Sequence, residues 1–306
     1  MPRYLACTLT LFAVLMCTRS NHAAEAVVPP EAKVFLGCWS SDDPNAKALI
    51  RIEPQRFSSA ENGQLSFFAA QLAPGKLIIK SQGRTVPIKL ELKSDKLLFT
   101  PEGGGPVLTF SKLSTTPDEL ELKPLKLGTK KEVPAEELKE IQFQFAKRLV
   151  TDQEVRKDQT KLNQIGAVDT ENTRYITKLI QEYGWIDVKR FGQSASNTAF
   201  LIVQHSGTLP LMISVLPEIE KDMKAGLLND GQNFALLYDR TQLYLGNKQK
   251  YGTQVGQNDK GDPIVLPLED KTKVEQYRKE LRMFSLEQYL SVFEKQFGKK
   301  VQFSDD

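Results

Sequence analysis

The residues of this chain best suited to chemistry lie in its second half. Gln204 and His205 adjoin at the end of an apolar run, and Asp239 and Arg240 adjoin further along. Histidine has an ordinary pKa near neutral pH, an aspartate can orient its ring, and an arginine can bind an anion. These residue types are compatible with a hydrolase-like enzyme in which His205 is the general base and Asp239 orients it.

A polar segment, GNKQKYGTQV, occupies residues 246–255 directly after the Asp-Arg pair. Gly252 would allow the backbone a positive φ or a close approach to a ligand. The side chains could recognise a small molecule, a glycan or a peptide, although such groups also tie loops to helix ends. We expect Gln249, Tyr251, Thr253 and Gln254 to form one wall of a polar pocket whose other wall includes His205. Arg240 is expected to bind the ligand as well.

Several classes of function find no support in the sequence. There is no G-x-S-x-G, H-E-x-x-H or phosphate-binding loop, and no cofactor is expected. With 41 basic and 38 acidic residues, the net charge of +3 gives no footprint for nucleic acid. The sequence therefore favours a binding or interaction protein, with the hydrolase as the alternative, and leaves open whether the protein is an enzyme.

The N-terminus has the pattern of a secretory signal peptide. A basic Arg3 precedes an apolar run, and small residues follow, so cleavage is expected after Ala24 or Ala26. The run is too short for a permanent membrane-spanning helix, which needs roughly 20 residues. We expect residues 1–26 to be removed and the protein to be exported, to the periplasm or outside the cell, rather than anchored as a lipoprotein. The mature chain would keep one histidine and one cysteine, which disfavours a metal site with several such ligands.

Residues 33–128 have the sequence pattern of an all-β barrel or sandwich. Short β-branched and aromatic runs alternate with turn clusters such as APGK and PEGGGP. The Gly37-Cys38-Trp39 start is similar to the Gly-x-Trp start of lipocalin-like barrels, in which the tryptophan closes one end. We expect Trp39 to be structural and Cys38 to be a packed residue rather than a nucleophile.

The remainder is predicted to be mainly helical. Residues 129–160 form a charged connecting helix with one apolar stripe, and residues 161–300 form a helical domain with a small β-hairpin around an NDKG turn. The predicted fold is α+β with two domains, the β-barrel or sandwich coming first.

The second half also resembles a bacterial domain family of unknown function, DUF6624, from about Val168 to Leu290. Its ordered motifs are Asp-x-x-Asn-Thr, Gly-Trp, Gln-His, Asp-Arg and a segment ending in Tyr-Gly-Thr-Gln. One departure is Ile186, where the family tends to have proline. The resemblance implies no activity, but it implies that the motif residues belong together. It thereby adds Asn172, Trp185 and Gln204 to the predicted ligand-binding residues.

Overall fold

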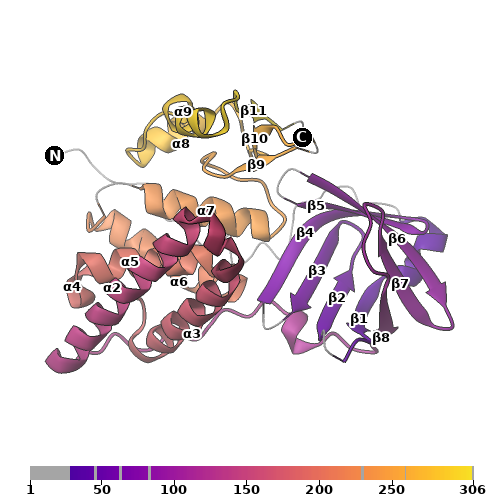
Figure 1. Ribbon diagram of the computed structural model, residues 1–306, viewed down its shortest axis with the longest axis horizontal. Helices are drawn as coiled ribbons and strands as arrows, with labels where there is room; N and C mark the ends of the chain where they lie inside the picture. Colours follow the sequence, from indigo (N-terminus) through magenta and orange to yellow (C-terminus); the bar gives the residue numbers. More distant parts are fainter. Residues whose placement is uncertain are drawn as a thin grey trace.

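The computed structural model describes residues 28–44, 47–61, 64–81, 84–228, 231–258 and 260–304. The predicted signal peptide, residues 1–26, lies outside these ranges. Figure 1 shows an N-terminal barrel beside a helical bundle, with a C-terminal segment lying across the top of the view. The predicted order of a β domain followed by a mainly helical region with a small sheet is confirmed.

Eight antiparallel strands form a closed barrel in sequence order, and β1 pairs with β8. The strands are β1 (Gly37–Ser41), β2 (Ala48–Ile52), β3 (Arg56–Glu61), β4 (Gln64–Ala73), β5 (Lys76–Ser81), β6 (Arg84–Lys93), β7 (Lys96–Pro101) and β8 (Leu108–Lys112). Between β6 and β7, Ser94 and Asp95 both have positive φ, which a two-residue turn of this twist requires. Apolar side chains fill the barrel, among them Leu77, Leu90 and Leu97.

Trp39 is buried in the barrel core together with Ala32 and Phe35. Its indole Nε1 donates to the carbonyl oxygen of Phe35 at 3.0 Å, at the end of the 3-10 helix η1 (Pro30–Phe35). The Lys112 Nζ atom lies 4.3 Å from the centre of the Trp39 ring. Trp39 is 2% exposed, so its role is structural. The lipocalin-like relationship itself stays a prediction.

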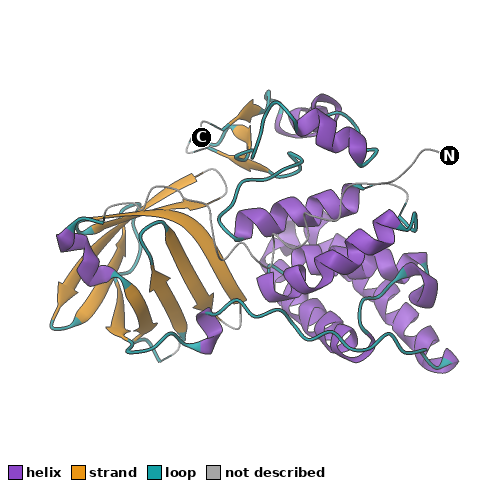
Figure 2. Cartoon of the chain, turned by 180° about the vertical axis from the view of Figure 1, so that it is seen from behind, coloured by secondary structure: helices purple, strands orange, loops and turns teal. Residues whose placement is uncertain are grey.

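The helical bundle begins after a short 3-10 turn, η2 (Asp118–Leu120), and contains a second one, η3 (Gln159–Gln164). Its helices are α2 (Ala135–Lys157), α3 (Ile165–Tyr183), α4 (Val188–Phe191), α5 (Gln193–His205), α6 (Leu209–Lys224) and α7 (Gln232–Tyr244). The largest apolar core of the described chain lies here and includes Phe145 of α2, Ile176 of α3 and Val203 of α5. The predicted connecting helix is thus α2, and it packs on α5 as part of the bundle. Figure 2 shows the helices gathered beside the barrel strands.

The C-terminal segment carries helices α8 (Val274–Glu280) and α9 (Leu286–Phe297). The predicted hairpin consists of β9 (Val255–Gln257) and β10 (Pro263–Val265), and the short strand β11 (Gln302–Phe303) adds to it in parallel. No helix of the described ranges is both long and apolar enough to cross a membrane.

The barrel and the bundle share a small apolar cluster. Leu209 of α6 is fully buried in it, together with Cys38, Leu65 and Phe67 of the barrel. Just after α7, Gly246 has φ +77°, and a Cβ there would stand 3.3 Å from the Ala69 amide of β4. The end of α7, and with it the segment that follows, is therefore held against the barrel.

Candidate functional site

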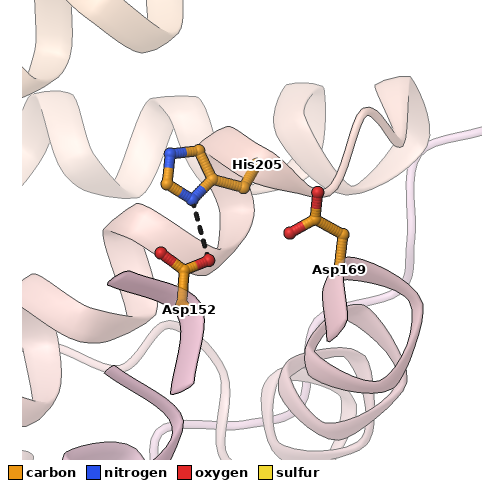
Figure 3. Close-up of side chains that lie close together, drawn as sticks. All are labelled: Asp152, Asp169 and His205. Atoms are coloured by element: carbon orange, nitrogen blue, oxygen red, sulfur yellow. Dashed lines mark hydrogen bonds and ion pairs between the residues drawn. The ribbon is translucent and has the colours of Figure 1, made fainter. Parts of the chain in front are cut away.

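His205 pairs with an aspartate of α2. Its Nδ1 atom lies 3.0 Å from Oδ1 of Asp152, and the two side chains are 19% and 4% exposed. Helix α5 ends at His205 because Gly207 follows with φ +62°. Figure 3 shows the carboxylates of Asp152 and Asp169 turned toward the same space beside the imidazole ring. The site therefore draws on three helices, α2, α3 and α5.

Arg156 joins the two carboxylates. It lies one turn after Asp152 on α2, contacts that carboxylate at 3.1 Å, and also contacts Asp169 of α3. Burial alone would raise the pKa of Asp152, but hydrogen bonds from His205 and Arg156 more than offset it and set this pKa at about 2. For Asp169, burial outweighs the attraction of Arg156 and raises the pKa. Asp152 is therefore the firmly ionised carboxylate.

The ionised Asp152 fixes the tautomer of His205. A carboxylate only accepts hydrogen bonds, so the proton must be on Nδ1 of the ring. The other nitrogen, Nε2, points away from both carboxylates in Figure 3 and has no hydrogen-bond partner among the described residues. In the neutral imidazole, Nε2 therefore presents a lone pair, as a general base does.

Arg240 lies at the same end of α5. Its Nη1 donates to the carbonyl oxygen of Gln204 at 2.7 Å, and its Nε donates to Oε1 of Gln254 at 3.2 Å. Burial lowers the pKa of Arg240, and the nearby positive charge of Arg156 lowers it further. Within the part of the chain that the structure describes, no carboxylate pairs with Arg240, and its Nη2 atom bonds to nothing.

Gln204 is a further unpartnered group. The residue is only 8% exposed, yet its side-chain amide makes no hydrogen bond to any described residue. The fully buried side-chain atoms without a partner do not include those of Gln204, so its amide reaches the surface and can bind water or a ligand. Arg240 Nη2, His205 Nε2 and the Gln204 amide are thus three unpartnered polar groups at one helix end.

A metal ion is the other species the cluster could hold. One ligand atom each from Asp152, Asp169 and His205 lies within 4.8 Å of the others. Oxygen and imidazole ligands suit several divalent metals. However, Arg156 bonds to both carboxylates and supplies the positive charge there, so a cation would have to displace it.

A family profile described as "Family of unknown function (DUF6624)" matches residues 140–302 of the 306-residue chain. The chain belongs to this family. The resemblance predicted from the motifs in its second half is thereby confirmed. No curated protein and no solved structure matches the chain. The DUF6624 match starts inside α2, so it includes Asp152 as well as His205 and Arg240.

Asp239 does not orient His205 in the DUF6624 domain, which corrects the sequence prediction. It is fully buried, and its carboxylate accepts hydrogen bonds from the backbone of the segment after α7. The donors are the amides of Lys250 at 2.8 Å, Tyr251 at 3.0 Å and Thr253 at 3.0 Å, and the Thr253 hydroxyl at 2.9 Å. The carboxylate bonded to His205 is instead that of Asp152. The carboxylate oxygens of Asp239 are occupied by hydrogen bonds from the segment after α7.

Most residues of the predicted pocket wall are buried inside the DUF6624 domain and hydrogen-bond within it. Gln249 is fully buried, and its Nε2 donates to the carbonyls of Gln254 and Leu266 at 2.9 and 2.8 Å. Thr253 bonds to Asp239, and Tyr251 is 6% exposed among aromatic rings. Gly252 has the expected positive φ, +68°, but a Cβ there would stand 2.9 Å from Leu286 rather than face a ligand. Of the predicted wall, only Gln254 reaches the site, through its bond to Arg240.

The two remaining predicted residues make no hydrogen bond to His205, Gln204 or Arg240. Asn172 accepts from Arg148 at 3.0 Å, and its buried amide nitrogen has no partner in the described chain. Trp185 donates to the buried Asp222 at 3.0 Å, beside a cavity of about 10 Å³. That volume holds one water molecule at most. The indole is therefore a core group rather than a ligand contact.

Sequence reasoning missed Asp152 and Arg156. Asp152 lies seven residues after Phe145 and eleven after Ile141, on the same buried face of α2. A charged residue on an otherwise apolar stripe needs a partner, and this signal could have identified it. Arg156 follows at the i+4 position, where side chains of a helix meet.

Proposed function

We propose that the DUF6624 domain binds a small ligand through an anionic group, at the end of α5. The observation that carries the proposal is the guanidinium of Arg240, which is half-buried and has no carboxylate partner among the described residues. A partly desolvated guanidinium without a counter-ion favours an anion, because charge-assisted hydrogen bonds are about twice as strong as neutral ones.

The neighbouring groups support this proposal. The Gln204 amide can donate to an anion, and Nε2 of His205 can accept a proton from a hydroxyl of the ligand or from water. Arg156 adds positive charge but stays bonded to Asp152 and Asp169. The groups favour a compact ligand with an acidic group beside a proton donor, such as a phosphorylated or carboxylated metabolite or sugar.

Inorganic phosphate and acetate are suitable probes for this site. The chain has only two histidines, so the imidazole signals in an NMR spectrum are few and His205→Gln assigns them. We expect phosphate, acetate or both to shift the His205 signal saturably and to raise the melting temperature. Arg240→Gln should weaken this binding by about 10- to 100-fold, the value of one charge-assisted hydrogen bond.

The matched control is Arg174→Gln, because Arg174 is 80% exposed on α3. This variant should bind both probes like the unaltered protein. The proposal fails if neither probe shifts the His205 signal, or if Arg240→Gln binds them as well as the control does.

We also propose that the protein is exported. Arg3, the apolar run after it and the alanines near residue 24 support this location. Cell fractionation with mass spectrometry of the N-terminus tests it. A mature protein that begins near residue 25 or 27 is expected outside the cytoplasm, and an intact Met1 in the cytoplasm would refute export.

A further inference from the structure

The state of His205 Nε2 limits what a bound anion can do. Asp152 accepts a hydrogen bond from Nδ1–H of His205, so the neutral ring carries its lone pair at Nε2. A lone pair repels a fully deprotonated anion but accepts a proton from water or a hydroxyl group. A base and an unpaired guanidinium at one helix end suit proton abstraction next to a negatively charged centre.

The nearby hydroxyl groups of the protein are already engaged. Ser206 donates to the carbonyl of Val203 at 2.8 Å and accepts from the amide of Thr208 at 3.1 Å. Thr253 donates to Asp239 at 2.9 Å. Neither of these hydroxyls is free to act as a nucleophile for His205, which favours water or a ligand hydroxyl as the group that loses a proton to Nε2.

We propose that the domain hydrolyses a small phosphomonoester, with His205 as general base and water as nucleophile; this rests on the proposed anion site. A phosphomonoester fits because the group that Arg240 holds is then also the electrophile. Arg240 and the Gln204 amide bind the phosphoryl oxygens, and Nε2 receives a proton from the attacking water.

The reaction balances without a further reactant. The water oxygen bonds to phosphorus while Nε2 takes one of its protons. The ester P–O bond breaks, and its electron pair goes to the alcohol oxygen, which takes the proton from Nε2. An alcohol and inorganic phosphate leave, and His205 returns to its neutral form. Asp152 is a positioning residue, because it acts only through the ring of His205.

The test uses p-nitrophenyl phosphate with the full chain, and phosphate affinity is measured in parallel. The wild-type protein and Arg174→Gln should release nitrophenol. His205→Gln should lower kcat by about 10²- to 10⁴-fold, the usual contribution of a general base. Its phosphate Kd should stay within about threefold, since Arg240 is unchanged. Arg240→Gln should lose both affinity and turnover.

Asp152→Asn separates a positioning role from a purely structural one. An asparagine amide can donate to Nδ1, which moves the ring proton to Nε2. We expect kcat to fall about as far as for a removed base, and the ¹⁵N shifts of His205 to report the other tautomer. An unchanged tautomer together with reduced turnover would remove Asp152 from its positioning role.

Four results overturn the hydrolysis proposal while the anion site stands. The first is phosphate binding without turnover above the buffer rate, and the second is turnover in His205→Gln within about threefold of wild type. The third is loss of turnover on chelation, with recovery in Mn²⁺. That result would place a metal at Asp152, Asp169 and His205, where the imidazole could not serve as the base. The fourth is absence of phosphate binding with acetate still bound, whereas absence of binding by both probes would refute the proposed function.

Discussion

Asp239 and Asp152 are both buried aspartates of the same domain, but their surroundings differ. Four donors from residues 250–253 surround Asp239, and the carboxylate is fully buried. Asp152 bonds to His205 and Arg156, both of which reach solvent. Near Asp152, Nε2 of His205, the side-chain amide of Gln204 and Nη2 of Arg240 have no hydrogen-bond partners among the described residues. Asp239 holds the segment after α7 in place. Asp152 orients His205, whose Nε2 atom can bind a ligand.

The difference separates structural from functional polarity. The residues around Asp239 and those around Asp152 are of similar polar types, so the sequence alone does not tell the two groups apart. What distinguishes them is whether the hydrogen-bonding capacity is used inside the protein. A buried polar group that is satisfied contributes to stability, whereas one that is unsatisfied destabilises the free protein unless a ligand or water completes it.

Asp239→Ala should have the largest effect on stability. It leaves the amides of Lys250, Tyr251 and Thr253 without an acceptor. At roughly 1–3 kcal/mol for each buried unsatisfied donor, with partial relaxation, we expect the free energy of unfolding to fall by about 4 kcal/mol. Urea unfolding followed by Trp185 fluorescence in a Trp39→Phe background measures the helical domain alone, because the chain has two tryptophans.

The control for this variant is Asp118→Asn, whose side chain is 85% exposed. It should change the free energy of unfolding by less than about 0.5 kcal/mol. A loss of under about 1 kcal/mol in Asp239→Ala would mean that the segment after α7 is not held by this carboxylate.

The sequence predicted the architecture better than the site. Period-two strands and period-3.6 helices depend on local patterning, so the β domain, the bundle and the small hairpin could be placed from residue types alone. The pairing of His205 could not, because Asp152 and Asp239 are 53 and 34 residues away and equally able to bond an imidazole. Only the packing of α2 on α5 decides between them.

The same limit applies to Tyr-Gly-Thr-Gln. A glycine flanked by amide and hydroxyl side chains has one sequence signature, whether it clamps a ligand or ties a loop to a helix. Here Gln249 and Thr253 are turned inward, and Leu286 fills the space beside Gly252. Burial is a property of the tertiary fold, and single-residue chemistry does not specify it.

Asp152→Asn should have an intermediate, pH-dependent effect. The pKa of Asp152 is about 2 in the folded protein, below the ordinary value near 3.9 in an unfolded chain. A lowered carboxyl pKa stabilises the fold above the unfolded value, and this stability is lost as pH falls through the folded value. The variant should lose about 2 kcal/mol at pH 7, and the gap to wild type should close between about pH 4 and pH 2.

Urea unfolding at pH 7, 5 and 3 measures this gap, and Asp118→Asn again serves as the control. A gap that stays constant across these pH values would mean that the loss comes from packing and not from the ionised pair with His205 and Arg156.

Gln204→Leu should have the smallest effect on stability. It therefore tests most directly the difference between satisfied and unpartnered polar groups. The amide of Gln204 makes no hydrogen bond to a described residue, so its removal should change the free energy of unfolding by less than about 0.5 kcal/mol, or raise it. Gln249→Leu is the matched comparison. It removes three hydrogen bonds, two from Nε2 and one to Oε1, and should cost about 2 kcal/mol. Phosphate affinity should show the reverse order: it should fall in Gln204→Leu and hold in folded Gln249→Leu. Equal stability losses in the two variants would mean that Gln204 is as structural as Gln249, and that an unpartnered amide does not mark the ligand site.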